Sequence, residues 1–456
     1  MPQRDHHSLP PADPQCTADQ DWQKLVEQRL PADLEAQAQQ LKAFVRARGV
    51  PSAQHLLRGL LYYVLSHSSL RSLSAWSRLI GLTSWVISGQ AWHKRLLASA
   101  DWLLWLFNAL LAAPTRSLGG QSQRILLVDA THVSCRAKQA DTWRLHCAYD
   151  LLAGRLAWLR ISTQQVGEGF AHVLLRVGDI VVGDGAYSRA KQLLAVAAAG
   201  AFSLVRYSTA HLPLYAPAAP AWTREYRLDV PAWLRTLSPG LYERQAMVVE
   251  QEGCLPVRLI ALVLPQDQAE ALRRQKQRQA RDKGRKLSAQ ALFLAGFVLL
   301  VTTLPAQPWS TEHLLELYRA RWQIEVLFKR IKPVLAMHTL PAQTPQGAQA
   351  MIYALLVAWM LIEEDVQTLR RQLSDGDPLD GPWSSWRLAH LAFEALRKVL
   401  EGHWTNSRLR AVLPELRRLF GEQRARPLRE HQHRYQFCQL VLCQSDLVVL
   451  FGCSSA

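Results

Sequence analysis

The spacing of hydrophobic positions changes several times along this chain, and each change predicts a different kind of element. From about residue 21 to 113, apolar residues such as Leu34, Leu41 and Val45 recur at the spacing of helices. The segment APTRSLGGQSQ, 113–123, breaks this pattern with small and polar residues and predicts a linker. We therefore expect a helical domain over 21–115, preceded by a disordered polar tail over 1–20.

Beyond the linker the apolar residues come in short runs typical of strands. The run RILLVD ends on a carboxylate, and so does DIVVGD. In chain order the predicted elements are a strand at 124–133, two strands within 144–163, a helix at 168–177, a strand at 179–187, a helix at 188–200 and a strand at 201–208. This order predicts an α/β fold with a mixed sheet.

The rest of the chain divides by composition. Residues 209–295 begin rich in proline, tyrosine and valine and end in the basic run QAEALRRQKQRQARDKGRK, which predicts an inserted β-rich segment. The apolar stretch GFVLLVTTLP and the helix YRARWQIEVLFKRIK follow it. We assign 124–208 and 296–340 to one core, and 341–456 to a helical C-terminal region that could serve in dimerisation.

Composition and charge narrow the class of protein. Lysine and arginine outnumber aspartate and glutamate by 53 to 37, which gives a net charge of +16 and favours a polyanionic partner. The longest apolar runs, near 102–113 and 291–301, fall short of the roughly 18 residues of a membrane span. The N-terminus lacks the apolar segment of a secretory signal, so we expect a soluble cytoplasmic protein. Seven scattered cysteines without a CxxC pair predict reduced, buried thiols.

Two aspartates follow apolar runs in the predicted sheet. Asp129 ends RILLVD and Asp184 ends DIVVGD, and ligands of α/β sheets bind at such strand ends. Taken singly, each is more simply a residue that starts a loop or caps a helix. Two of them on neighbouring strands favour a functional site.

The helix YRARWQIEVLFKRIK supplies a third acid. At 100° per residue, Tyr318, Arg321, Glu325 and Lys332 fall within roughly a 60° arc and form one polar stripe. The simplest alternative is a surface ion pair, but the apolar neighbours predict that most of the helix is packed, where an unpaired charge is costly. Three converging carboxylates suit two hard divalent cations, Mg²⁺ or Mn²⁺, which can activate a hydroxyl in phosphoryl transfer.

These residues resemble the catalytic core of an Asp-Asp-Glu transposase of the insertion sequence 4 family. That family's signature of Tyr, Arg, Glu and Lys at fixed spacing is met at Tyr318, Arg321, Glu325 and Lys332. Its two aspartates resemble Asp129 in VDATHV and Asp184 in GDGAYS. The likeness covers roughly residues 60–340.

The resemblance implies a fold, a reaction and partners. The fold is ribonuclease-H-like, and Asp129, Asp184 and Glu325 hold two Mg²⁺ or Mn²⁺ ions. Tyr318, Arg321 and Lys332 contact DNA phosphates. The reaction is hydrolysis at the transposon ends followed by strand transfer into double-stranded target DNA, in a cut-and-paste route carried out by a homodimer. Two alternatives use the same residues: a domesticated or inactive DNA-binding protein, and a nuclease of the same fold.

Other features keep two interpretations each. The basic residues of 60–100 suit either a helix-turn-helix-like domain that recognises terminal repeats or a domain with only a packing role. The run 273–286 suits either a surface that follows DNA or a disordered charged loop. The aromatic residues of the insertion could hold a flipped DNA base or form the hydrophobic core of the insertion. The histidines near the core motifs are expected to be structural, and the cysteines and histidines of the last 30 residues match no common zinc spacing. The basic residues are Arg71, Arg78, Lys94 and Arg95, and the aromatic residues are Trp222, Tyr226 and Trp233. The histidines near the core are His132, His146 and His172, and the C-terminal histidines and cysteines are His431, His433, Cys438 and Cys443.

Overall fold

The computed structural model describes residues 18–80, 82–84, 87–113, 123–135, 143–219, 222–251, 253–373 and 384–401. The predicted tail, apart from its last three residues, lies outside these ranges. So do most of the predicted linker and the cysteines and histidines considered as zinc ligands near the C-terminus.

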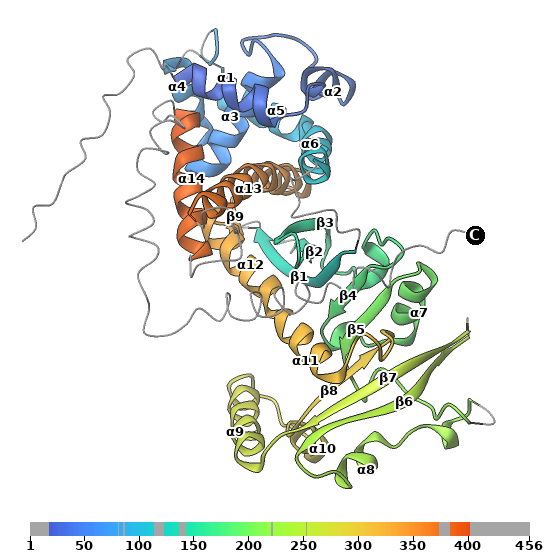
Figure 1. The fold of residues 1–456 in the computed structure, drawn as a ribbon. Helices are drawn as coiled ribbons and strands as arrows, with labels where there is room; N and C mark the ends of the chain where they lie inside the picture. The colour runs from blue at the N-terminus through green and yellow to red at the C-terminus, as the bar shows by residue number, and fades with distance from the viewer. Residues whose placement is uncertain are drawn as a thin grey trace, which may run out of the picture.

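A mixed β-sheet runs through the middle of the molecule in the order β3-β2-β1-β4-β5-β8-β7-β6, with the short β9 paired to the end of β1 (Figure 1). The strands are β1 Ile125–Cys135, β2 Trp143–Asp150, β3 Arg155–Thr163, β4 Ile180–Gly183, β5 Phe202–Arg206, β6 Gly240–Glu250, β7 Gly253–Val263, β8 Phe297–Thr302 and β9 Thr339–Leu340.

Strand directions follow from the connections. β1, β2 and β3 form an antiparallel meander, whereas β4 lies parallel to both β1 and β5. β8, β7 and β6 then continue the sheet antiparallel from β5. The central strand β4 is a run of four buried residues, as expected for a strand covered on both faces. The predicted mixed α/β fold with a mixed sheet flanked by helices is confirmed.

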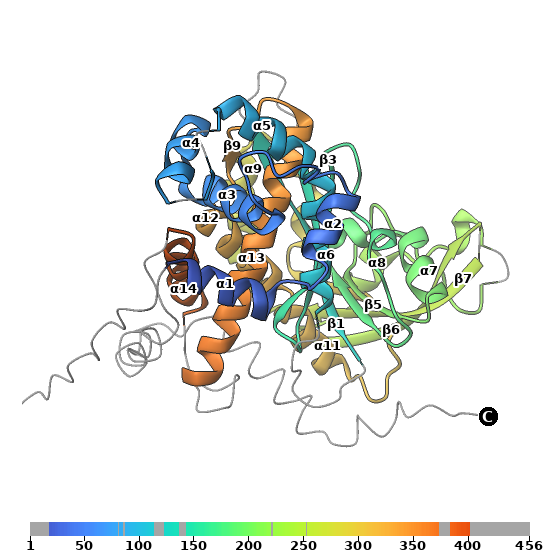
Figure 2. The ribbon, with the colours of Figure 1, turned by 90° about the horizontal axis from the view of Figure 1, so that it is seen from above.

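Helices cover the sheet unevenly (Figures 1 and 2). The N-terminal helices and the two last helices gather at one end, and α7 lies on the other side of the sheet beside β5. The helices are α1 Ala18–Arg29, α2 Leu34–Gln40, α3 Ala53–Ser66, α4 Leu70–Leu79, α5 Gly89–Ala98, α6 Ala100–Ala112, α7 Ala190–Ala198, α8 Val230–Arg235, α9 Gln266–Asp282, α10 Ala289–Leu294, α11 Thr311–Ala320, α12 Trp322–Val334, α13 Pro345–Leu373 and α14 Ser385–Glu401. Short 3₁₀ turns are η1 Phe170–His172, η2 Gly185–Tyr187 and η3 Arg224–Tyr226.

Helix α13 is the centre of the helical layer. It packs against α3, α5, α6 and α14, and 83% of its most apolar 18-residue window is buried inside the molecule. Its length and hydropathy alone would allow it to cross a membrane, but its burial is that of a core helix. Because most of its surface is covered by its own chain, little of α13 is left for contact with a second copy.

The structure corrects several local predictions. β1 runs past Asp129 to Cys135, because β2 pairs with it as far as Val133 and β9 pairs with Ser134 and Cys135. The helix predicted at 168–177 is wrong: only the 3₁₀ turn η1 forms, and Phe170 turns inward to stack on Tyr187. Cys135 and Cys147 are buried, reduced thiols as predicted, whereas Cys254 is exposed near the turn of the β6–β7 hairpin.

The helix predicted at 318–332 is divided into α11 and α12. Arg321 separates them, and backbone bonds from Arg321 N to Tyr318 O and from Ile324 N to Arg321 O replace the α-helical pattern there. Arg321 keeps right-handed helical dihedral angles, so the two helices still run end to end along one side of the sheet (Figure 1).

Buried charges join α12 to α13. Glu363 of α13 is fully buried among Arg330 of α12, Arg155 of β3 and Arg370 of α13. Burial raises the pKa of Glu363, and Arg330 acts in the opposite direction. Arg330 is itself buried, and its helix α12 packs against α14.

Replacement of Glu363 by Ala should lower the free energy of unfolding by about 3–5 kcal/mol, because it leaves buried arginines without their carboxylate. The neighbouring Glu364 is the matched control, since its side chain is 54% exposed and lies 4.0 Å from Arg29. Glu364→Ala should cost about 1 kcal/mol or less. Urea denaturation of both variants measures the difference, and equal losses would contradict the assignment.

Candidate active site

The two predicted aspartates lie side by side where the pairing of β1 with β4 stops. The last paired residues are Leu127 and Val182, so the register carried on by two residues brings Asp129 beside Asp184. Asp184 follows β4 directly, and its Oδ1 accepts a hydrogen bond from Ala186 N at 2.8 Å, which caps η2. Asp184 therefore both ends a strand and caps a helical turn, as the two interpretations of the sequence predict.

Close packing fixes the turn after β4. A Cβ atom on Gly183 would come within 2.9 Å of the rings of Phe170 and Tyr187. These rings stack with their centroids 4.6 Å apart, and both are fully buried. A glycine is therefore required immediately before Asp184, and the turn that carries this aspartate has little freedom to move.

Arg321 connects the strand acid to the helix acid. Its Nη2 donates to Glu325 Oε1 at 2.5 Å, and its Nη1 lies 3.5 Å from Asp129 Oδ2. The sequence predicts a phosphate contact for Arg321, yet in this structure its guanidinium stands between two of the three predicted metal ligands. Glu325 is thus paired with Arg321, and Arg321 also contacts Asp129 of the sheet.

Asp129 is held in an environment that disfavours its charge. Its pKa is raised from 3.8 to about 6, first by burial and further by the nearby carboxylates of Asp184 and Glu168. The backbone N–H of Ala130 and the guanidinium of Arg321 act in the opposite direction. Acids gathered in this way favour the arrival of a cation.

Tyr318 and Lys332 lie at the two ends of the polar stripe. The ring of Tyr318 is half-buried, with its centroid 6.0 Å from the Arg321 guanidinium carbon, and burial raises its pKa. Lys332, in the last turn of α12, is half-buried, and burial lowers its pKa. Its helix packs against β1, and Lys332 lies near Cys147, the strand partner of Asp129.

Glu168 is a carboxylate at this site that the sequence analysis does not identify. It precedes η1, and it interacts electrostatically with both Asp129 and Asp184. Its loop is attached to β2 through Arg144, whose Nη1 donates to Val166 O at 2.7 Å. The one available sequence signal is an acid between Gly167 and Gly169, which does not distinguish a site residue from a polar loop residue.

The three histidines near the core have protein partners, in line with the structural role expected for them. His146 Nε2 lies 2.8 Å from Ser162 Oγ, and burial lowers its pKa to about 4. His132 contacts Arg144, and His172 contacts Arg160.

The donor set suits a hard divalent cation in its chemistry, because it consists of carboxylate oxygens. Within the described ranges, however, no three acidic, histidine or cysteine side chains are gathered closely enough to hold a metal ion as they stand. The guanidinium of Arg321 provides the positive charge between Asp129 and Glu325 instead. The residues fit a metal site provided that the guanidinium of Arg321 moves from its position between Asp129 and Glu325.

Two aspartates at neighbouring strands and a glutamate delivered by a helix form the kind of acidic centre that phosphoryl-transfer enzymes use. Residues 120–361, just over half of the chain, match the family described as the transposase DDE domain. The chain belongs to the DDE transposase family, whose members are phosphoryl-transfer enzymes. The resemblance found in the sequence is confirmed at the level of this family.

Individual relatives support the same assignment. The transposase for insertion sequence element IS421 of Escherichia coli is 32% identical over 348 residues, which cover 74% of this chain and 91% of that protein. The transposase for insertion sequence element IS231D of Bacillus thuringiensis subsp. finitimus is 23% identical over 336 residues, 65% of this chain and 69% of that protein.

The raised pKa of Asp129 predicts a pH-dependent gain of stability in Asp129→Asn. The folded state holds this proton more tightly than the unfolded chain, so the stabilisation by protonation is complete below pH 3.8 and is lost as the pH rises through about 6. The variant has no such loss. In metal-free buffer its stability relative to wild type should rise by about 1–3 kcal/mol between pH 4 and pH 7.5. Denaturant unfolding at several pH values measures this, and a difference independent of pH would contradict it.

Proposed function

We propose that this protein is an insertion-sequence transposase that cleaves transposon ends and joins them to target DNA by a cut-and-paste route. The observation that carries the proposal is the meeting of Asp129 and Asp184, at neighbouring strands, with Glu325 of α12 through Arg321. The spacing of Tyr318, Arg321, Glu325 and Lys332 supports membership of the insertion sequence 4 group, and the strand order supports a ribonuclease-H-like core.

Asp129, Asp184 and Glu325 would hold two Mg²⁺ or Mn²⁺ ions, which activate the attacking hydroxyl and stabilise the leaving oxygen when bound. The chain's own part is to keep the acids in place. The pairing of β1 with β2 fixes Asp129, the packed turn at Gly183 fixes Asp184, and α12 carries Glu325.

Arg321 would change partners during the reaction. In the absence of other cations it balances the charges of Asp129 and Glu325. When metal ions take over that balance, its guanidinium becomes available for a DNA phosphate, which it can bind through two parallel hydrogen bonds. Tyr318 and Lys332 on the same stripe would contact neighbouring phosphates.

Double-stranded DNA would be bound over a larger surface than the site itself. Helix α9 places the basic run of the insertion on an exposed helix, with Arg274, Arg278 and Arg281 all exposed. Among the N-terminal helices, Arg71 and Lys94 are exposed, whereas Arg95 bonds to the carbonyls of Ala91 and Arg48. We assign end recognition to the N-terminal helices, pairing of two ends to a homodimer, and the bacterial cytoplasm to the protein.

Purified protein should nick DNA that carries the inverted repeats flanking its gene when Mn²⁺ or Mg²⁺ is added. Asp129→Ala and Glu325→Gln should each reduce the nicking rate by about 10³-fold or more, because each removes a metal ligand. Gel analysis of end-labelled DNA measures the rate. Nicking that survives either substitution would overturn the active-site assignment. Binding of the ends without nicking by the wild type would favour a DNA-binding protein instead.

The variant with Arg274→Gln, Arg278→Gln and Arg281→Gln should bind DNA with a weaker dependence on salt. Each lost phosphate contact lowers the slope of log K against log salt concentration by about 0.9, so three lower it by about 2.7. Fluorescence anisotropy at several salt concentrations measures the slope. The same number of charges removed at Arg371, Arg397 and Lys398 serves as the control. An unchanged slope would place the DNA elsewhere.

A further inference from the structure

The connection between β8 and α11 decides where the catalytic helices begin. It runs from Thr303 to Ser310, and Ser310 caps α11 by accepting a hydrogen bond from His313 N. Its first residue is attached to β5, because Ser203 N donates to Thr303 Oγ1 at 2.9 Å. From Ser310 the chain passes directly through α11 to Arg321 and α12.

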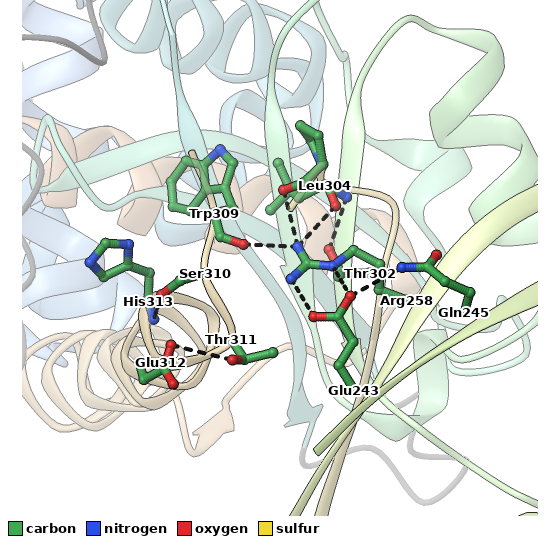
Figure 3. A network of polar contacts seen from close by, with 11 residues as sticks. Glu243, Gln245, Arg258, Thr302, Leu304, Trp309, Ser310, Thr311, Glu312 and His313 are labelled. Atoms are coloured by element: carbon green, nitrogen blue, oxygen red, sulfur yellow. Dashed lines mark hydrogen bonds and ion pairs between the residues drawn. The ribbon is translucent and has the colours of Figure 1, made fainter. Parts of the chain in front are cut away.

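A single arginine of the β6–β7 hairpin holds the rest of this connection (Figure 3). The Nη1 of Arg258, on β7, donates to the carbonyl oxygens of Leu304 at 3.2 Å, Pro305 at 3.0 Å and Trp309 at 2.8 Å. The Nε and Nη2 of the same guanidinium donate to the two carboxylate oxygens of Glu243, on β6, at 2.9 and 2.7 Å. We call these five residues the Arg258 network.

The network is built for rigidity. The side chain of Arg258 is 6% exposed, and that of Glu243 is 27% exposed. A guanidinium shielded from water needs both a counter-charge and acceptors, and the paired bonds to Glu243 supply the first in a fixed orientation. The Nη1 donors point at backbone carbonyls, so the connection cannot shift without leaving charged hydrogen-bond donors unpaired.

The position of Glu325 depends on this anchor. The carbonyl of Trp309 immediately precedes the cap of α11, and α11 packs against β5 and β6. At its far end α11 meets Arg321, whose contact with Asp129 is 3.5 Å long. That long ion pair holds Glu325 to β1 only loosely, whereas the Arg258 network fixes the start of the same helical segment to the sheet.

We propose that Arg258, held by Glu243, is a positioning residue for the DNA-cleavage reaction, and that it makes the β6–β7 hairpin and the α11–α12 segment one mechanical unit. In this proposal the buried Arg258 contacts neither DNA nor the reacting atoms and acts by setting where Glu325 and Arg321 stand relative to Asp129. The inference rests on the proposed function for its catalytic part, whereas the mechanical part can be measured without DNA.

The first measurement is hydrogen–deuterium exchange of the DNA-free protein. Arg258→Met removes all five hydrogen bonds at similar side-chain length, and Glu243→Gln removes only the counter-charge. Arg124→Met is the matched control, because Arg124 forms paired bonds to Asp179 and one bond to Leu174 O at the opposite end of β1 and β4. We expect faster exchange in residues 304–325 for Arg258→Met, a smaller increase for Glu243→Gln, and no increase there for Arg124→Met.

The second measurement separates positioning from binding and from general stability. With DNA ends fully bound and Mn²⁺ present, single-turnover cleavage by Arg258→Met should be about 10–100-fold slower than by wild type, since small displacements of reacting groups have effects of this size. The dissociation constant for the ends should stay within about twofold. Arg258→Lys, which keeps the charge and some carbonyl contacts, should recover part of the rate.

The outcomes are distinguishable. Equal exchange at 304–325 in Arg258→Met and Arg124→Met, or equal losses of cleavage rate in both, would overturn the proposal. If Arg258→Met does not fold, the comparison of Glu243→Gln with Arg124→Met decides the matter in the same way. Wild-type protein that binds ends without cutting them would overturn the proposed function, and the exchange data would still decide whether the network anchors α11.

Discussion

The gathering of like charges at one end of the parallel strands is the constraint on which this site depends. Asp129, Asp184 and Glu168 interact with one another, and α12 adds Glu325. Such a cluster needs positive charge, and here the guanidinium of Arg321 provides it between strand and helix. The same electrostatic demand that an arginine meets in this state can be met by divalent cations, so the proposed metal ligands and the proposed phosphate contact of Arg321 can share one place.

The scaffold holds the acids with unequal firmness. Asp129 is paired with Cys147 of β2, and Asp184 lies in a turn packed beneath Phe170 and Tyr187. Glu325 instead comes on a helical segment that starts from a loop and packs against β5, β6 and β1. Its two ends are secured by buried charges: the Arg258 network at the start of α11, and the interaction of Arg330 with Glu363 of the core helix α13. Ionic contacts in dry surroundings are orientation-specific, which suits them to this task.

Sequence patterns predicted much of this architecture because they reflect local requirements. Helical and strand spacing gave the mixed α/β fold, and the carboxylates at apolar runs led to Asp129 and Asp184. Prediction failed where a distant partner overrides the local pattern. The stretch 168–177 has helical spacing, yet Phe170 is drawn inward by Tyr187 and only a 3₁₀ turn remains. The sequence predicts an inserted β-rich segment but does not indicate its neighbour in the sheet: β7 pairs with β8, so the β6–β7 hairpin extends the main sheet.

The sequence by itself therefore predicted most of the elements, the family that the chain resembles and three candidate acids, because periodicity and motif spacing are properties of neighbouring residues. Only the tertiary structure decided what each charge faces. Arg321 lies 192 residues from Asp129, and Arg258 lies about 50 residues from the carbonyls it binds, so no local pattern connects them. Their pairing follows from the exclusion of water at the places where the folded elements meet, which is a property of the whole fold.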